Sequence, residues 1–85
     1  MTENDKTKLK MMLFQASELY LSPFSDIRIE MYCKILEDYP IDKIGNAMML
    51  HYKDEKKGSK LPLPSDIVAK INVIREEERA LARIR

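Results

Sequence analysis

The sequence predicts an all-helical protein, and three observations lead to this prediction. Apolar side chains recur at helical spacing in four separate segments of the 85 residues. Serine and proline residues separate these segments where helices commonly begin or end. No segment alternates apolar and polar residues as a half-buried strand does. We therefore expect a single domain, a small four-helix bundle with a Pro-rich extended connector before a long C-terminal helix. The helices are expected over about residues 4–21, 23–38, 41–52 and 66–85.

The first two predicted helices meet at a serine–proline step. Asn4 or Asp5 can cap the first helix, because short polar side chains accept hydrogen bonds from the free amides of a first turn. Ser22 is the predicted cap of the second helix, and Pro23 suits its first position. The apolar stripe of the first helix contains Leu9, Met12, Leu13, Ala16, Leu19 and Tyr20. The stripe of the second contains Phe24, Ile27, Met31, Tyr32, Ile35, Leu36 and the following Tyr39.

The third predicted helix follows Tyr39-Pro40 and contains a glycine. Gly45 should cost about 1 kcal/mol relative to alanine inside a helix, so we expect another helix to pack closely against it. His51 lies at the end of the apolar face. It is either a boundary histidine, which is the commoner case, or a contact or acid–base group. The apolar face contains Ile41, Ile44, Ala47, Met48, His51 and Tyr52.

The connector before the last helix has a polar half and a proline-rich half. Residues 53–60 are charged and predict a solvated loop, whereas residues 61–64 should be extended because each proline disfavours a helical predecessor. Ser65 is the predicted cap of the last helix. That helix would be about 30 Å long, so its distal part is expected to project. Its apolar stripe contains Ile67, Val68, Ile71 and Ile74, extended by Leu81 and Ile84.

The composition narrows the classes of protein. No apolar run approaches the roughly 20 residues of a membrane span, and the polar N-terminus lacks the apolar region of a secretory signal. The single cysteine, Cys33, excludes an internal disulfide and fits a reducing, cytoplasmic setting. A formal net charge of +1 argues against strong non-specific DNA binding, although a local basic patch remains compatible with it.

The sequence contains no recognisable catalytic set. Two glycines, Gly45 and Gly58, cannot build a phosphate-binding loop, and one cysteine with one histidine cannot build a zinc site. Cys33 lies in an apolar-periodic stretch and reads as an inert thiol, because a nucleophile needs a partnered base. We therefore expect a protein that is not an enzyme, binds no cofactor or metal, and acts by binding another macromolecule.

Three surfaces are candidates for that contact. The charged last helix can dock into a protein groove or pair with its own copy; its alternative is a solvent-exposed helix end with internal ion pairs. The basic loop is the nucleic-acid candidate, with a merely solvated loop as the commoner reading. Some methionines and a leucine fall off the predicted core faces and could form an exposed patch. The helix residues are Arg75, Arg79, Leu81, Arg83 and Ile84, the loop residues are Lys53, Lys56, Lys57 and Lys60, and the others are Met11, Met49 and Leu50.

The stretch from Leu36 to Ile71 has a distinctive order of features. A Tyr-Pro step ends one helix, the next helix carries an alanine and a His-Tyr end, and a polar loop, a Pro-rich segment and a capped helix follow. This order resembles the phage helicase loader/inhibitor family, small proteins that bind the replicative helicase. The resemblance covers about residues 22–72. Its elements here are Tyr32, Tyr39-Pro40, Ala47, His51-Tyr52, Lys53–Lys60, Leu61–Pro64 and Ser65-Asp66-Ile67.

The resemblance implies a partner, the replicative helicase or its loader, which the chain would load or inhibit during phage or mobile-element replication. The chain departs from the family at two places. Its proline step reads Leu-Pro-Leu-Pro, where an aromatic residue followed by paired prolines is more usual. The segment beyond the bundle, to which helicase contact is attributed in the family, is here the short charged tail after Ile74. A nucleic-acid-binding regulator and an inhibitor of an unrelated host or defence complex are the alternatives.

Overall fold

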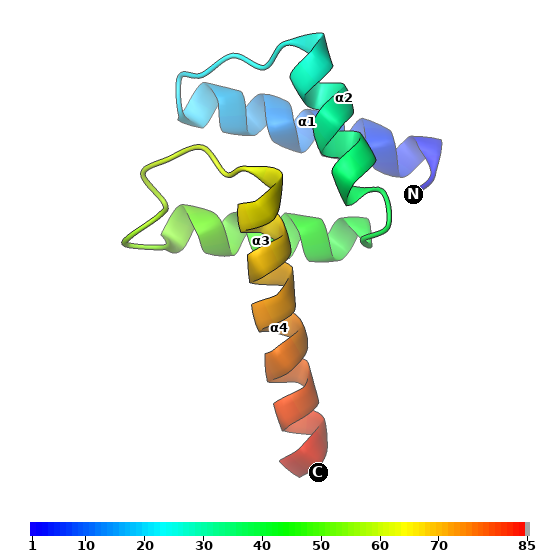
Figure 1. Cartoon of the computed structure of the whole chain (residues 1–85), viewed down its shortest axis with the longest axis vertical. Coiled ribbons are helices and arrows are strands. Elements are labelled where there is room, and N and C mark those ends of the chain that lie inside the picture. Colours follow the sequence, from blue (N-terminus) through cyan, green and yellow to red (C-terminus); the bar gives the residue numbers. More distant parts are fainter. Residues whose placement is uncertain (85) are drawn as a thin grey trace.

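The computed structural model describes residues 1–84 and confirms the all-helical class. Its elements are α1 (Glu3–Leu19), α2 (Asp26–Leu36), α3 (Ile41–Lys53) and α4 (Pro64–Ile84), and residues 1–84 contain no strand. In Figure 1, α1 and α3 lie side by side, α2 crosses α1, and α4 crosses α3 and extends beyond it. The arrangement is flat, with extents of 44 × 32 × 16 Å. Arg85, where the last helix was predicted to end, lies outside the described residues.

The first helix begins and ends with local hydrogen bonds that differ from the predicted ones. Thr2, rather than Asn4 or Asp5, is the N-cap: its hydroxyl accepts from the Asp5 amide at 3.1 Å, and the Asp5 carboxylate accepts from the Thr2 amide at 3.3 Å. At the other end Leu21 has a φ of 50°, a left-handed conformation that usually favours glycine. The chain therefore leaves the helix at Leu19 rather than at residue 21.

The second helix starts three residues later than predicted. Ser25, not Ser22, is the N-cap, and its hydroxyl accepts from the Arg28 amide at 3.2 Å. Pro23 therefore lies outside the helix. The physical reason is the position of Phe24, whose ring packs edge-on against Tyr32 with centroids 5.1 Å apart. Residues 22–25 have no helical structure.

Only one of the two apolar stripes on α2 is buried in the core. Cys33 and Leu36 are buried, but Ile27, Met31 and Ile35 are 77 %, 52 % and 47 % exposed, so their predicted burial is wrong. Leu19 on α1 is exposed as well. α2 carries apolar side chains on opposite faces, and helical spacing alone does not show which face meets α1 and α4. The buried core contains Leu9, Leu13, Ala16, Tyr32, Cys33, Leu36, Ile44, Ala47, Met48, Ile67 and Ile71.

The last helix begins one residue before the predicted cap. Pro64 occupies the first helical position, so Ser65 is inside the helix and is not its cap. The carbonyl of Leu63 accepts from the amides of Asp66 and Ile67, and the Asp66 carboxylate accepts from the Leu63 amide at 3.0 Å. Proline is well suited to this place because its missing N–H would have had no helical partner.

The two glycines should respond oppositely to alanine. A Cβ on Gly58 would lie 2.4 Å from the Asp54 carbonyl oxygen and 2.8 Å from that of His51, so the backbone would have to move. A Cβ on Gly45 would meet only the flexible Met12 sulfur, at 3.5 Å, so α1 does approach α3 here but leaves room for alanine. We expect Gly58→Ala to lower the free energy of unfolding by about 1–3 kcal/mol. Gly45→Ala should raise it by up to about 1 kcal/mol.

Urea unfolding of both variants, followed by circular dichroism, measures this difference, and each glycine serves as the control for the other. Equal effects of the two substitutions would contradict the close approach of the Asp54 and His51 carbonyl groups to Gly58.

Candidate interaction surfaces

The distal part of α4 is the most exposed regular element of the protein. Ile67 and Ile71 are fully buried and Ile74 is half-buried, but every residue from Glu76 to Ile84 is exposed. An ion pair between Lys43 on α3 and Glu78 joins this part to the body. The projection expected from the length of the helix is therefore present, and Figure 1 shows it clearly.

The five predicted contact residues of α4 do not form one surface. Successive residues of a helix are about 100° apart, so Arg75, Arg79 and Arg83 form one row, whereas Leu81 and Ile84 lie on another side. The arginines also differ in their surroundings. The Arg75 guanidinium lies over the Tyr39 ring, 5.4 Å from its centroid, and Arg79 pairs with Glu76 at 3.0 Å. Arg83 is in none of the ion pairs of residues 1–84.

The basic loop is more ordered than a solvated loop, because Asp54 organises it. One Asp54 carboxylate oxygen accepts from the amides of Lys56 and Lys57, at 2.8 and 2.9 Å. The other oxygen receives the Lys70 ammonium of α4 at 2.6 Å. The side chains of Lys53, Lys56, Lys57 and Lys60 are exposed. Asp54 therefore fastens the basic loop to α4.

The whole connector between α3 and α4, the basic loop included, is held by hydrogen bonds to its carbonyl groups. Tyr20 donates its hydroxyl to Gly58 at 2.7 Å, and Tyr32 donates to Pro62 at 2.8 Å. Burial raises the pKa of both tyrosines, so both hydroxyls keep the proton that they donate. Tyr20 is the C-cap of α1 and Tyr32 lies in α2, so both are far from the connector in sequence. They fix its path across the helices.

His51 makes a third contact to the same connector. Its Nε2 lies 2.7 Å from the carbonyl oxygen of Lys60, and the residue is 1 % exposed, so the boundary position predicted for it is wrong. A carbonyl oxygen can only accept, so Nε2 carries the proton. Nδ1 is buried without a hydrogen-bond partner in residues 1–84. The surroundings assign His51 a structural role as a donor that fastens the connector.

Acid should weaken the attachment of the basic loop. The Lys70 ammonium, followed by the amides of Lys57 and Lys56, holds the pKa of the Asp54 carboxyl well below its usual range. The stability that this carboxylate supplies is complete above its unfolded pKa of about 4 and is lost as the pH falls towards the lower folded pKa. Below about pH 4, the free energy of unfolding should therefore fall more steeply with decreasing pH for the wild type than for Asp54→Asn. The difference between the two slopes should correspond to the uptake of up to about one proton.

Urea unfolding at a series of pH values measures the two slopes. All other carboxylates are common to both proteins, so parallel acid limbs would show that Asp54 has an ordinary pKa in the folded chain.

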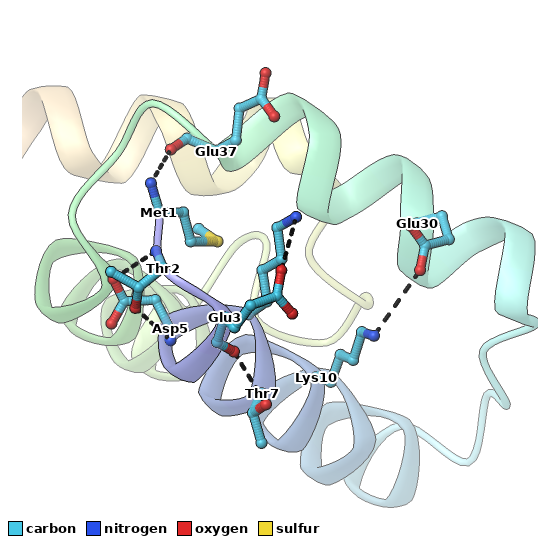
Figure 2. A network of polar contacts seen from close by, with 9 residues as sticks. Met1, Thr2, Glu3, Asp5, Thr7, Lys10, Glu30 and Glu37 are labelled. Carbon is cyan, nitrogen blue, oxygen red and sulfur yellow. Dashed lines mark hydrogen bonds and ion pairs between the residues drawn. The ribbon is translucent and has the colours of Figure 1, made fainter.

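A groove of about 710 Å³ lies between α1 and α2. Figure 2 shows Lys10 of α1 reaching Glu30 of α2, a 3.9 Å ion pair, and the Met1 ammonium donating to the Glu37 carbonyl. Cys33 is one of the residues that line this groove. Burial raises the pKa of its thiol, and the nearby Glu30 carboxylate has a smaller effect in the same direction. A neutral, buried thiol is a poor nucleophile, in agreement with the inert role predicted for it. The groove is lined by Glu3, Lys6, Lys10, Asp26, Ile27, Glu30, Met31, Cys33, Lys34 and Glu37.

The remaining apolar candidates separate by exposure. Met11, Met49 and Leu50 are exposed, as their positions off the predicted core faces suggested, whereas Met48 is buried. The exposed residues belong to two helices, α1 and α3. Among residues 1–84, no three His, Cys, Asp or Glu side chains gather closely enough to hold a metal ion. None of the helices in this range combines the length and apolar composition needed to cross a membrane.

Comparison with protein-family models, with curated proteins and with solved structures found no match to this chain.

Proposed function

We propose that the chain is a non-catalytic adaptor that binds the replicative DNA helicase or its loader in the cytoplasm. It would load or inhibit the helicase during phage or mobile-element replication. The observation that carries this proposal is the projecting end of α4, which presents exposed apolar and cationic side chains. The order of features between Leu36 and Ile71 supports the choice of partner, because it resembles the helicase loader/inhibitor family.

The mechanism would be stoichiometric binding. The four helices and the Pro-rich connector form a scaffold that sets the direction of α4. Arg75 against Tyr39 and Lys43 with Glu78 hold its middle, so its free end is pre-oriented and loses less entropy on binding than a flexible tail. Leu81 and Ile84 would enter an apolar groove, with Arg79 and Arg83 against acidic groups on the groove rim.

Calorimetric titration of a purified replicative helicase with the chain tests this proposal. We expect Ile84→Glu and the double variant Arg79→Glu/Arg83→Glu each to weaken binding by at least about tenfold, because each places a charge where the contact is proposed. Ile27→Glu is the matched control: Ile27 is as exposed as Ile84 but lies on α2. Absence of binding by the wild type to helicase and to loader would reject the proposal.

Cross-linking mass spectrometry on the complex purified from host cells names the partner without assuming it. Recovery of a replication protein linked to α4 supports the proposal. Recovery of a different host or defence complex would favour the alternative that the chain is an inhibitor of that complex.

A second candidate is nucleic-acid binding through the basic loop, favoured by the exposure of its four lysine side chains. Asp54 opposes it by placing a carboxylate among them. Phosphate contacts release counterions, so binding of this kind must weaken steeply with salt. Gel-shift titrations at several salt concentrations decide it: no binding at low salt, or no salt dependence, removes this candidate.

A further inference from the structure

Three consecutive glutamates of α4 differ in their surroundings. Glu76 pairs with Arg79 at 3.0 Å, and Glu78 pairs with Lys43 of α3. Glu77 is exposed between them, and no ion pair within residues 1–84 includes it. Its carboxylate is therefore available to a cation from another molecule.

Glu77 lies inside the apolar side of α4 and not beside it. At about 100° per residue, Val73, Leu81 and Ile84 fall within about 80° of the helix circumference, and Glu77 falls between them. These three apolar side chains are 48 %, 60 % and 82 % exposed. Glu77 follows Val73 by four residues and precedes Leu81 by four, so each of them lies one turn away on the same side of the helix.

The end of α4 cannot dock through its apolar residues without involving Glu77. Side chains of a helix lean towards its N-terminus, so Leu81 lies over the turn that carries Glu77, and a groove wall that covers Leu81 also reaches the carboxylate. The ion pair between Lys43 and Glu78 fixes the side of α4 that faces the body, so the helix cannot rotate Glu77 out of such a contact. Docking therefore removes water from the Glu77 carboxylate.

A carboxylate that loses water without gaining a cation weakens binding, because its lost hydration is not replaced. We propose that the groove of the partner carries a lysine or arginine side chain at its mouth, which pairs with Glu77 in the complex. This inference rests on the function proposed above and adds the chemistry of the partner site, an apolar groove with a cation at its entrance. Glu77 thus determines specificity, since an apolar groove without this cation leaves the carboxylate unpaired.

Calorimetric titration of the protein that binds α4, the replicative helicase or its loader, tests the pairing with Glu77→Gln and Glu77→Leu. We expect both substitutions to weaken binding at least about tenfold, because each leaves the partner's cation without its carboxylate. Glu18→Gln is the matched control and should leave the affinity unchanged. Glu18 is an exposed glutamate of α1 that takes part in no ion pair within residues 1–84.

Two results would overturn the pairing and leave the proposed function intact, provided that Ile84→Glu still weakens binding. Equal affinities of Glu77→Gln and the wild type would place Glu77 outside the contact. Tighter binding by Glu77→Leu would mean that the contact covers the carboxylate without supplying a cation. Absence of wild-type binding to helicase and to loader would overturn the pairing together with the proposed function.

Discussion

Leu36→Ala is expected to lower the free energy of unfolding by about 2–5 kcal/mol, whereas Ile35→Ala should lower it by less than about 1 kcal/mol. Leu36 on α2 is fully buried in the core of the protein, so truncation removes apolar contacts and leaves a cavity that neighbouring helices fill only in part. Ile35 is 47 % exposed and its loss leaves no closed cavity. For a domain of this size, the larger loss is a substantial fraction of a total stability of about 5–15 kcal/mol.

The two adjacent positions form a matched pair, because they share the helix, the substitution and nearly the same side-chain volume. Urea unfolding measured by far-ultraviolet circular dichroism gives both values. A loss at Ile35 as large as the loss at Leu36 would mean that the core lies against the other apolar stripe of α2, the stripe with Ile27 and Met31.

His51→Ala is expected to lower the free energy of unfolding by about 2–4 kcal/mol. The substitution removes a fully buried ring and also leaves the Lys60 carbonyl without the donor that lies 2.7 Å away. The connector between α3 and α4 should then loosen. Hydrogen exchange should show this locally, as faster exchange of the Gly58 and Lys60 amides, which donate within the loop.

Tyr20→Phe is the control for His51→Ala, because it deletes one hydrogen bond to the same connector and keeps the ring. It should cost about 0.5–1.5 kcal/mol. The comparison separates the loss of a hydrogen bond from the loss of buried volume. A cost of less than about 1 kcal/mol for His51→Ala would show that His51 does not fasten the connector.

The candidate contact residues could be predicted only in part. Helical spacing after Ile74 was sufficient to predict a last helix longer than the other three, and this length predicted that its distal part would project. The same spacing places Arg79 on a different side of the helix from Leu81 and Ile84. Which of these sides faces away from α3 is known only from the tertiary structure. Arg75 could not be recognised as partly engaged, because its neighbour Tyr39 is 36 positions away in the chain.

The sequence by itself determined the all-helical class and the approximate position of each helix. These depend on local chemistry: apolar spacing, capping side chains and proline. Even so, the residue with the left-handed conformation after α1 is Leu21 and not a glycine. No glycine therefore marked the end of this helix in the sequence, and the boundary was misplaced. The cap of the second helix was also wrong: Ser22 was predicted, whereas Ser25 is the N-cap.

Only the tertiary structure decided which apolar face of α2 is buried, and that the loop after α3 is fastened rather than free. Both depend on contacts between distant residues, such as Asp54 with Lys70 and His51 with the Lys60 carbonyl. The free energy of burial depends on which surfaces meet, and two faces of equal hydrophobicity are equivalent until another helix covers one of them.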